Sequence, residues 1–516
     1  MKFFYADSLD QTSLVYDLIN EEYIQNKEGL LTKRNPYKDD KYFHEVFDSV
    51  QYKNGHYQST ICGYHGLLLS LHSYYTNYVN KSSSSLPTIF RFPPQNTKKE
   101  SKILFDPQYT NFNFRKKNRK KKHVACEKLP IIADSGAFYY KDQTVPPYNT
   151  LDVVSTYKHF QCTYGVALDH IPNHAKIADE KNKYCKRTVE LQKKIMSAQK
   201  KLLLLDQQLS LFEDDSTTQR KSNLKNQIDA HSSILESIEA EHPQKIKQYE
   251  MERDFRWNLS LENAKEFLSE HKKQNASFIP IGTAHGWDAE SYRQSAMALQ
   301  QMGYKYIAIG GLVPIASDQE RIKYFVEEIS NSLSAKIPLH LFGIKSIKPK
   351  EIQYYHSLNV RSFDTSSPMT QSMKDSRSNY WSDEKNYINL RIPKIDASRI
   401  IDSSIVEGHV SRQEAKKQEA LCLTLVRALD SANPPNEHDV LSALEEYAAM
   451  YKKPFSQAQR ELTLETLRDK PWHLCTCRIC LHFGVEVMIF RGTVRNKARG
   501  FHNIWKLGQW VRQGDT

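Results

Sequence analysis

The chain has 516 residues and a formal net charge of +12, with 72 Lys and Arg against 60 Asp and Glu. This length fits one barrel of about 250 residues with additions, or two to three smaller domains, and no apolar run reaches the roughly 18 residues of a membrane-spanning helix. Eight cysteines are too few for a disulfide-stabilised scaffold, and the excess of basic residues favours a polyanionic partner.

The first eleven residues, MKFFYADSLDQ, contain one lysine, a short apolar stretch and then acidic residues. This is not the pattern of a secretory signal. Three of the cysteines lie within six positions near the end of the chain, which indicates metal binding in a reducing compartment. We therefore expect a cytoplasmic protein without membrane contact.

A strongly basic run, RKKNRKKKH, lies within residues 109–123, beside Tyr109, Phe112 and Phe114. A charge run is often only a solvated loop. The alternative is a loop that contacts phosphates, with its aromatic rings available to stack on unpaired bases. In that case the nucleic-acid contacts come from Arg115, Lys116, Lys117, Arg119, Lys120, Lys121 and Lys122.

Six short apolar runs have the composition of buried strands, and each ends in a small or acidic residue. They are Leu129–Ala133, Gly165–Leu168, Phe278–Ile281, Tyr306–Ile309, Leu339–Phe342 and Val360–Phe363. Helical stretches separate several of them, including Ala289–Met302 and Asp318–Ala335. This alternation predicts an α/β fold with a parallel sheet, and we favour a (β/α)8 TIM barrel over an open doubly wound sheet.

Between the second and third runs, residues 173–248 carry apolar side chains with alternating spacings of four and three. The repeat runs through Leu191, Ile195, Ala198, Leu202, Leu205, Leu209 and Phe212, and after a polar break through Leu224, Ile228, His231, Leu235 and Ile238. It predicts two amphipathic helices that fold back as an antiparallel coiled-coil hairpin. Such a hairpin could brace the fold, form a homodimer or reach along a long substrate.

From Ser404 to Asp469 the chain reads as helical, and a cysteine cluster follows. Cys475, Cys477 and Cys480 form the pattern C-x-C-x2-C, which can wrap three thiolates round one tetrahedral zinc ion. We expect His502 as the fourth ligand, because His473 and His482 lie too close to the cysteines. Such a closed site is structural and leaves no position open for zinc-dependent hydrolysis; the alternative is a metal-free, reduced cluster.

We therefore divide the chain into four parts. Residues 1–172 form the first part of the barrel with the basic loop, and residues 173–248 form the hairpin. Residues 249–403 complete the barrel, and residues 404–516 form a helical, zinc-binding subdomain.

Three aspartates directly follow predicted strands, namely Asp134, Asp169 and Asp364. A single aspartate there is often only a helix cap or a salt-bridge partner, but three round a barrel can converge in one pocket. This arrangement suits base exchange at a glycosidic carbon, with one carboxylate attacking the sugar, another moving protons and a third binding a guanine-like base. Gly310–Gly311 would let the backbone approach the heterocycle, and Phe138 could stack on it.

In combination these motifs resemble the tRNA-guanine transglycosylase superfamily. The family has the motifs D-S-G-G-[FY], R-W, G-G-L, M-G and M-F-D. The similar segments of this chain are, in the same order, Asp134–Phe138, Arg256–Trp257, Gly310–Leu312, Phe342–Gly343 and Phe363–Asp364. The family's zinc ligands are similar to the cysteine–histidine set. The resemblance implies a barrel with a zinc subdomain, Asp364 as nucleophile and Asp134 as general base. It also implies that Asp169 reads the base, with Ser135 as a further substrate-binding residue.

Two departures from the family pattern bear on the substrate. The arginine-containing stretch with which tRNA enzymes read the anticodon loop corresponds to Thr365–Gln371, which has no arginine. The V-Q-G-G that helps to hold the substituent on the base corresponds to Thr283–Gly286, without the glutamine. His285 and His170 are the candidates to replace it, and for each the alternative is a buried structural histidine.

The ends of the chain resemble the DpdA branch, which modifies DNA. The similar segments are Phe3–Ser8, Lys470–Cys475, Ile489–Gly492 and Arg499–Asn503. This resemblance implies exchange of guanine in double-stranded DNA for 7-cyano-7-deazaguanine (preQ0), in a multiprotein system with an ATPase partner. A base in a duplex must first be flipped out, for which the basic run and the hairpin are candidate tools.

Two alternatives stay open. One is a tRNA-modifying enzyme of the same chemistry, against which the missing arginines count. The other is a non-catalytic barrel that serves as a nucleic-acid-binding subunit, against which the three retained aspartates count.

Overall fold

The computed structural model of the chain describes residues 1–6, 64–74, 130–160, 162–208, 215–345, 347–374, 377, 379–395 and 405–514. It also describes three short antiparallel strand pairs between residues 12 and 58. These strands are β2 (Thr12–Ser13), β3 (Tyr16–Asp17), β4 (Glu22–Tyr23), β5 (Asp40–Lys41), β6 (Gln51–Lys53) and β7 (His56–Gln58). The basic run Arg115–His123 lies outside the described residues.

Eight parallel strands close into a barrel in the order β1–β14–β13–β12–β11–β10–β9–β8. Their bounds are β1 (Lys2–Ala6), β8 (Gly66–Ser70), β9 (Ile131–Asp134), β10 (Tyr164–Val166), β11 (Ile279–Ala284), β12 (Ile307–Ile309), β13 (Leu339–Leu341) and β14 (Val360–Thr365). The ring closes where β1, from the start of the chain, pairs in parallel with β14. The (β/α)8 barrel is therefore confirmed, and the six predicted runs correspond to β9 to β14.

An apolar layer fills the interior of the barrel. It consists of Phe4, Leu68, Ile132, Val166, Ile281, Tyr306 and Ala308, one or more from almost every strand. Such a packed interior leaves no pore, so a substrate has to bind at one end, among the loops that follow the strands.

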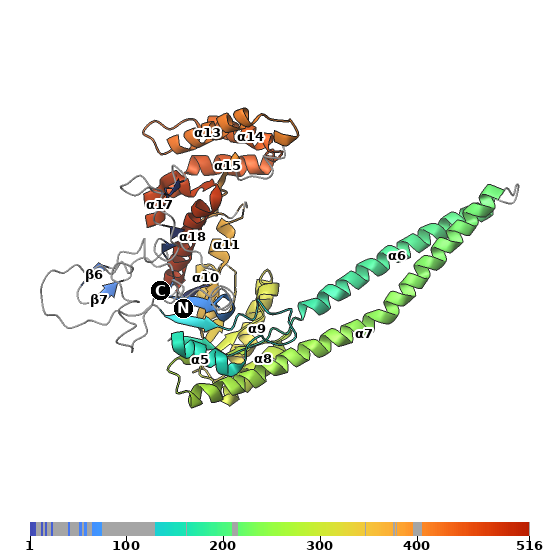
Figure 1. Ribbon diagram of the computed structural model, residues 1–516, viewed down its shortest axis with the longest axis horizontal. Coiled ribbons are helices and arrows are strands. Elements are labelled where there is room, and N and C mark those ends of the chain that lie inside the picture. Colours follow the sequence, from blue (N-terminus) through green and yellow to red (C-terminus); the bar gives the residue numbers. More distant parts are fainter. Residues whose placement is uncertain are drawn as a thin grey trace.

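Helices cover the outside of the barrel (Figure 1). They include α5 (Thr150–Phe160), α8 (Ala289–Met302), α9 (Gln319–Ser332), α10 (Pro349–Ser357) and the short α11 (Ser367–Ser372), with a short α3 (Leu71–Tyr74) after β8 and a 3-10 turn, η3 (Val313–Ile315), after β12. The sequence sets the ends of α8: Asp288 caps its first turn in a capping box, and Gly303 ends it with a φ of +103°.

The predicted hairpin consists of α6 (Ala175–Gln208) and α7 (Asp215–Lys273), which project together as a long arm (Figure 1). Leu191 and Ala198 of the apolar repeat are buried in the seam between them. A proline inside α7, Pro243, removes one helical hydrogen bond. Beyond the hairpin, α7 continues without interruption to Lys273 and becomes a barrel helix, so the arm is an extension of the connection between β10 and β11.

The C-terminal subdomain is mainly helical. It contains α13 (Arg412–Ala428), α14 (Glu437–Met450), α15 (Gln457–Asp469), α16 (Pro471–Leu474), α17 (Arg478–Phe483), a 3-10 turn η5 (Gly484–Val487) and α18 (Gly492–Gly514), with a small strand pair of β15 (Leu390–Arg391) and β16 (Ile489–Phe490). The last helix, α18, packs against α10 and α11 of the barrel. Among the described helices, none combines the length and apolar character needed to cross a membrane.

Candidate active site

The three predicted aspartates lie at the same end of the barrel. Asp134 is the last residue of β9, Asp169 lies three residues beyond β10, and Asp364 is in the last part of β14. Because all eight strands are parallel, their carboxyl ends open onto one mouth, where barrel enzymes hold their catalytic groups. The structure thus brings together the three side chains to which the sequence assigned the chemistry.

The carboxyl group of Asp134 is strongly perturbed by its surroundings. Burial raises its pKa to about 8, and the nearby charge of Asp169, followed by that of Asp364, acts in the same direction. A hydrogen bond of 3.0 Å from the backbone N–H of Gly136 to Asp134 Oδ2 opposes the shift. A carboxyl group with such a raised pKa holds a proton near neutral pH and can act as an acid.

Asp169 is held by side chains on both of its carboxylate oxygens. Ser135 Oγ donates to Oδ1 at 2.7 Å, and His285 Nε2 donates to Oδ2 at 2.7 Å. The hydroxyl of Tyr140 lies 2.7 Å from Ser135 Oγ and 2.9 Å from the backbone oxygen of Asp169. A carboxylate has about four lone-pair positions, so the fixed Asp169 can still accept hydrogen bonds from a ligand.

His285 lies directly after β11, against the glycine pair that follows β12. A Cβ atom on Gly310 would come within 2.5 Å of the His285 ring, and Gly311 has a φ of +73°, so both positions favour glycine. His285 Nδ1 is buried and has no hydrogen-bond partner among the described residues. His170, the other candidate, likewise has a buried Nδ1 without a partner among the described residues, but its Nε2 contacts the backbone oxygen of Gln143 at 2.9 Å and not Asp169.

Asp364 is positioned by a histidine that the sequence reasoning missed. The backbone N–H of Gly343 donates to Asp364 Oδ1 at 3.1 Å, and His340 Nε2 lies 3.3 Å from the same oxygen. On its other side, His340 Nδ1 lies 2.6 Å from Ser362 Oγ, which also contacts the hydroxyl of Tyr306. The sequence feature that could have revealed this residue is a histidine in the middle of the apolar run Leu339–Phe342.

Phe138 stands at the rim of the mouth. Its side chain is 52% exposed, and the ammonium group of Lys141 lies 5.4 Å from the centre of its ring. The ring is therefore accessible to a ligand, in contrast to Ser135, which is fully buried behind Asp169.

One face of α7 fastens the loops that carry these side chains. The buried guanidinium of Arg256 donates to the backbone oxygens of Lys141 and Gln143 in the loop after β9. Ser260 Oγ bonds to the backbone N–H of His170 at 2.8 Å, and Trp257 Nε1 donates to the backbone oxygen of His285 at 2.8 Å. The helix that forms the arm thus also fixes the loops after β9, β10 and β11.

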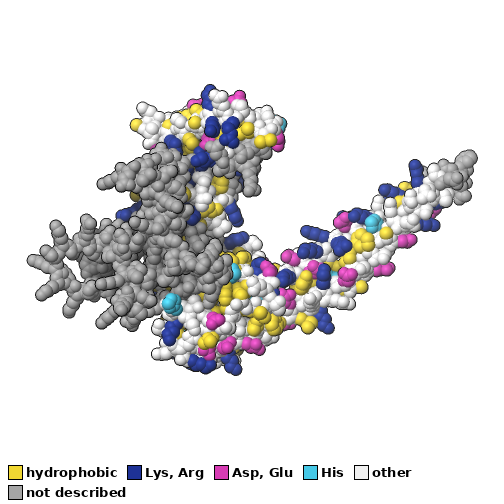
Figure 2. Space-filling model, in the orientation of Figure 1, with side chains coloured by type: hydrophobic (Ala, Val, Ile, Leu, Met, Phe, Trp, Pro, Cys, Tyr) yellow, Lys and Arg dark blue, Asp and Glu magenta, His cyan; other side chains and the backbone are white. Residues whose placement is uncertain are grey.

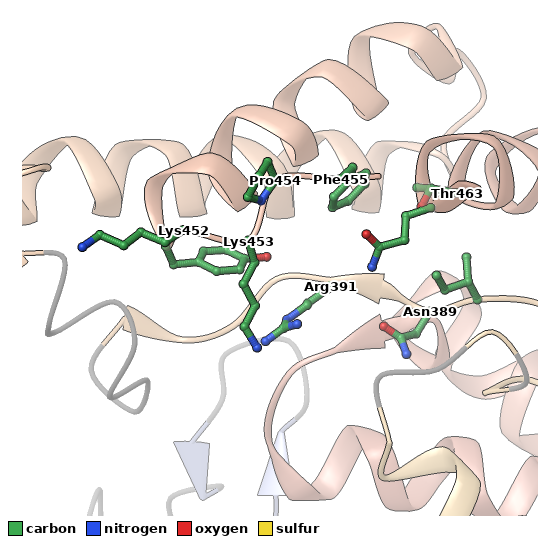
Figure 3. A pocket seen from close by; sticks show the side chains of 10 residues that line it. Asn389, Arg391, Lys452, Lys453, Pro454, Phe455 and Thr463 are labelled. Atoms are coloured by element: carbon green, nitrogen blue, oxygen red, sulfur yellow. The ribbon is translucent and has the colours of Figure 1, made fainter. Parts of the chain in front are cut away.

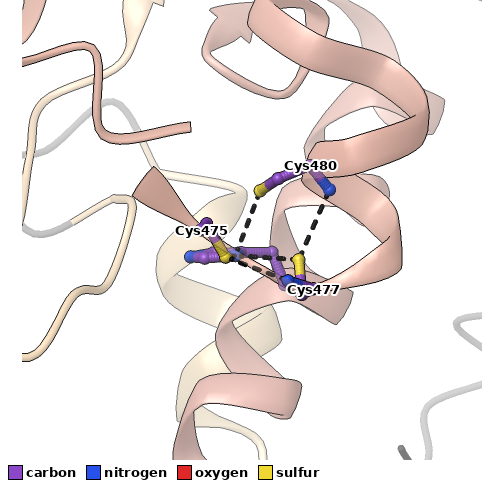
Figure 4. A group of neighbouring side chains, drawn as sticks. Cys475, Cys477 and Cys480 are labelled. Carbon is purple, nitrogen blue, oxygen red and sulfur yellow. Dashed lines mark hydrogen bonds between the residues drawn. The ribbon is translucent and has the colours of Figure 1, made fainter. Parts of the chain in front are cut away.

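A second cluster, in the C-terminal subdomain, has the donor set of a metal site (Figure 4). The ligand atoms of Cys475, Cys477, Cys480 and His502 lie within 4.8 Å of one another, and each sulfur is 3.4 Å from His502 Nδ1. Tetrahedral zinc with bonds of about 2.3 Å to sulfur and about 2.1 Å to nitrogen needs separations of roughly 3.6–3.8 Å, so a small expansion would fit it. His502 Nε2 donates to the backbone oxygen of Trp381 at 2.8 Å, which leaves Nδ1 free to bind a metal.

The competing histidine His473 contacts Asp430 at 2.8 Å and stands outside this cluster. A further pocket in the subdomain, with Asn389, Arg391 and Lys453 among its lining residues, contains none of the three aspartates (Figure 3). The candidate active site is therefore the barrel mouth, and the Cys3His cluster is separate from it.

Comparison with known proteins agrees with this geometry. The family model for queuine tRNA-ribosyltransferase matches residues 219–377, which include His285, Gly310–Gly311 and Asp364. A DNA-guanine transglycosylase from Salmonella montevideo is 30% identical over 383 residues, which cover 74% of this chain and 75% of the relative. The chain belongs to the guanine transglycosylase superfamily, in the branch of that DNA-guanine transglycosylase, and it is a base-exchange enzyme of the glycosyltransferase type.

Proposed function

We propose that the enzyme exchanges guanine in double-stranded DNA for 7-cyano-7-deazaguanine through a covalent bond between Asp364 and the sugar. The observation that carries this proposal is the convergence of three aspartates with three different environments at one barrel mouth. The reduced cysteine cluster fits a cytoplasmic setting.

Asp364 has the environment of a nucleophile. Its carboxylate oxygen attacks the anomeric carbon of the deoxyribose while the bond from that carbon to guanine breaks, and the proton of Asp134 goes to the departing base. Asp134 then takes the ring N–H proton of the incoming base, whose nitrogen attacks the anomeric carbon and releases Asp364. Gly343 and His340 hold Asp364 in place for both steps.

Asp169 and His285 are the proposed base readers. Asp169 accepts hydrogen bonds from the amino and ring N–H groups of the base, and Ser135 supports it from behind. His285 Nδ1, which has no hydrogen-bond partner among the described residues, lies beside Gly310 and takes the place of the family's glutamine. Phe138 is exposed at the rim and can stack on the flat heterocycle.

Two observations favour DNA over tRNA. The relative that covers most of the chain is named a DNA-guanine transglycosylase. In addition, the segment after Asp364 forms α11, whose Pro368, Met369 and Ser372 are buried, and Met369 lies against Gly500 of α18. This segment packs on the subdomain and presents no arginine to a nucleic acid.

Further contacts belong to the same proposal. The basic residues of Arg115–His123 would bind phosphates near the target base, and an ATPase partner would assist in opening the duplex. The Cys3His cluster would hold one structural zinc ion, which braces the subdomain and takes no part in the exchange. The arm could also support a homodimer.

The test is an exchange assay with radiolabelled guanine, in which the purified enzyme is offered a DNA duplex and a tRNA transcript side by side. We expect label in the DNA, and none when Asp364→Asn replaces the wild type. Because a missing ATPase could hide the activity, the same pair of enzymes is also compared by base analysis of DNA from cells that carry the whole modification system. Label in tRNA alone would establish the tRNA alternative, and full modification by Asp364→Asn would contradict catalysis by this residue.

A further inference from the structure

Helix α6 carries three pairs of basic residues at intervals of seven. The pairs are Lys186–Arg187, Lys193–Lys194 and Lys200–Lys201, and all six side chains are exposed. We call these six residues the basic ladder. A spacing of seven residues returns to the same side of a helix that packs in a coiled coil, so the pairs lie above one another along one side of the arm.

The seam of the coiled coil shows which side this is. Leu191, Ile195, Ala198 and Leu202 mark the inner positions of the repeat, and Lys186, Lys193 and Lys200 fall at the position farthest from this seam. Their partners in each pair fall at the neighbouring position. With a rise of about 1.5 Å per residue, the pairs repeat every ~10.5 Å and together span about 22 Å.

The charge of the ladder is largely uncompensated. Helix α6 has nine basic and four acidic side chains, a net charge of +5, whereas residues 215–247 of α7 have five of each. Among the described residues, Lys194 makes an ion pair with Glu190 at 2.7 Å, and the other five ladder residues make none. A surface that serves only solubility would not require the cations to lie on one helix of the hairpin, nor to repeat every seven residues.

The ladder also has a fixed position relative to the active site. Helix α6 begins six residues after Asp169, so the arm begins at the barrel mouth. Its base is held by Arg256 and Trp257 of α7, which bind the loops of the site. Figure 1 shows α6 on the side of the arm that faces the C-terminal subdomain, and Figure 2 shows Lys and Arg side chains projecting along the arm.

We propose that the basic ladder binds the sugar–phosphate backbone of the DNA duplex beside the target base. This inference rests on the proposed function, since it takes DNA as the substrate. A duplex carries one charge per about 1.7 Å of its axis, both strands counted, so a length of about 22 Å carries roughly 13 phosphates, of which those on one side face the ladder. The ladder positions the duplex on the mouth and leaves the reading of the base to the barrel.

The test compares two triple variants of the full-length protein, each of which loses three positive charges. The ladder variant is Lys186→Gln, Lys193→Gln and Lys200→Gln. The control variant removes exposed lysines on the outside and at the opposite end of the barrel, namely Lys265→Gln, Lys272→Gln and Lys305→Gln. Glutamine is a good helix former, and circular dichroism and thermal melting show whether both variants fold as the wild type does.

Binding of a fluorescent 30-base-pair duplex and of a tRNA transcript is measured by anisotropy over a series of salt concentrations. We expect the ladder variant to bind the duplex more weakly and to lose up to about 3 from the slope of log K against log salt, with a clearly smaller change in the control. Equal changes in the two variants would overturn the ladder while leaving the DNA substrate intact. A wild type that binds tRNA and no duplex would overturn the DNA substrate, and the ladder proposal with it.

Discussion

The side chain of Asp134 has a role in the proposed exchange, but its burial lowers the stability of the fold. Burial and two neighbouring carboxylates make its ionised form unfavourable, which is why its pKa rises to about 8. In the unfolded chain the same group titrates near pH 4. Folding is therefore coupled to protonation of Asp134 over a window of about four pH units.

This coupling predicts a pH-dependent effect of Asp134→Asn on stability. The folded wild type keeps the proton that the unfolded chain releases above about pH 4, so its stability falls as the pH rises toward 8, by at most about 1.4 kcal/mol per pH unit. The amide of the variant does not titrate and can still accept the N–H of Gly136. We expect the variant to melt at a higher temperature than the wild type, with a difference that grows from pH 5 to pH 8 in calorimetric scans and then levels off. A constant difference would mean that Asp134 is not perturbed.

His340 is a positioning residue for the nucleophile, and its replacement should act on the chemical step. His340→Leu removes a hydrogen-bond donor to Asp364 from a buried site. We expect this to lower the rate of the chemical step roughly 10- to 100-fold. His340→Gln keeps an N–H group at a similar distance and should restore much of the rate. Stopped-time trapping of the enzyme–DNA adduct measures this step, and we expect kcat to change more than KM. If both variants lose activity equally, His340 acts only through packing.

The contrast between the aspartates and His340 shows what the sequence can reveal at this scale. Asp134, Asp169 and Asp364 could be found because each is a carboxylate directly after a strand. The contact between His340 and Asp364 joins two strands across 24 residues of sequence, and it depends on a register that contains an irregularity between Leu339 and His340. Tyr140 was missed for a similar reason, because only the folded loop brings it to Ser135.

At the scale of elements, α7 connects the arm with the active site. The indole N–H of Trp257 donates to the backbone oxygen of His285. The Trp257 ring packs edge-on against the ring of Trp287, with the ring centres 6.4 Å apart. The helix therefore fixes the backbone of one of the proposed base readers.

Trp257→Phe tests this connection, since phenylalanine keeps an aromatic ring and loses the donor. Loss of one such hydrogen bond is worth about 1 kcal/mol, so we expect KM for the incoming base to rise roughly fivefold while kcat changes little. Trp287→Phe is the matched control, because it changes the neighbouring ring and leaves the bond to His285 in place. Steady-state kinetics with varied base concentration measures both variants. An equal rise in KM for the control would assign the effect to packing.

The elements themselves were predictable to different degrees. The strands β9 to β14 and helix α8 could be read from apolar runs and caps. The strands β1 and β8 were not singled out, because FFYA and LLL are short runs without a helix predicted on either side. The length of α7 was also hidden, since its coiled-coil repeat fades where the helix leaves the arm and joins the barrel.

At the scale of the whole molecule, the Cys3His cluster connects the subdomain to the barrel. His502 is part of α18, which packs on α10 and α11, and its Nε2 bonds to Trp381 in the chain that leads out of the barrel. The aromatic ring of Tyr380 stacks on His502 with centres 3.8 Å apart. Since α11 follows Asp364 directly, loss of the cluster should disturb the support of the active site.

Cys477→Ser should therefore affect zinc content, stability and activity together. Cys477 is buried and its backbone begins α17, so a weaker ligand there opens the site and releases the ion. We expect one zinc per wild-type chain by atomic absorption, less than a tenth of that in the variant, and a free energy of unfolding lower by about 3 kcal/mol or more, as for other structural zinc sites. Cys185→Ser, an exposed thiol on α6, is the control and should keep the zinc and the melting temperature. Because the Cys3His cluster is separate from the aspartates, a variant that loses zinc and yet melts and exchanges guanine as the wild type does would show that the cluster does not brace the barrel.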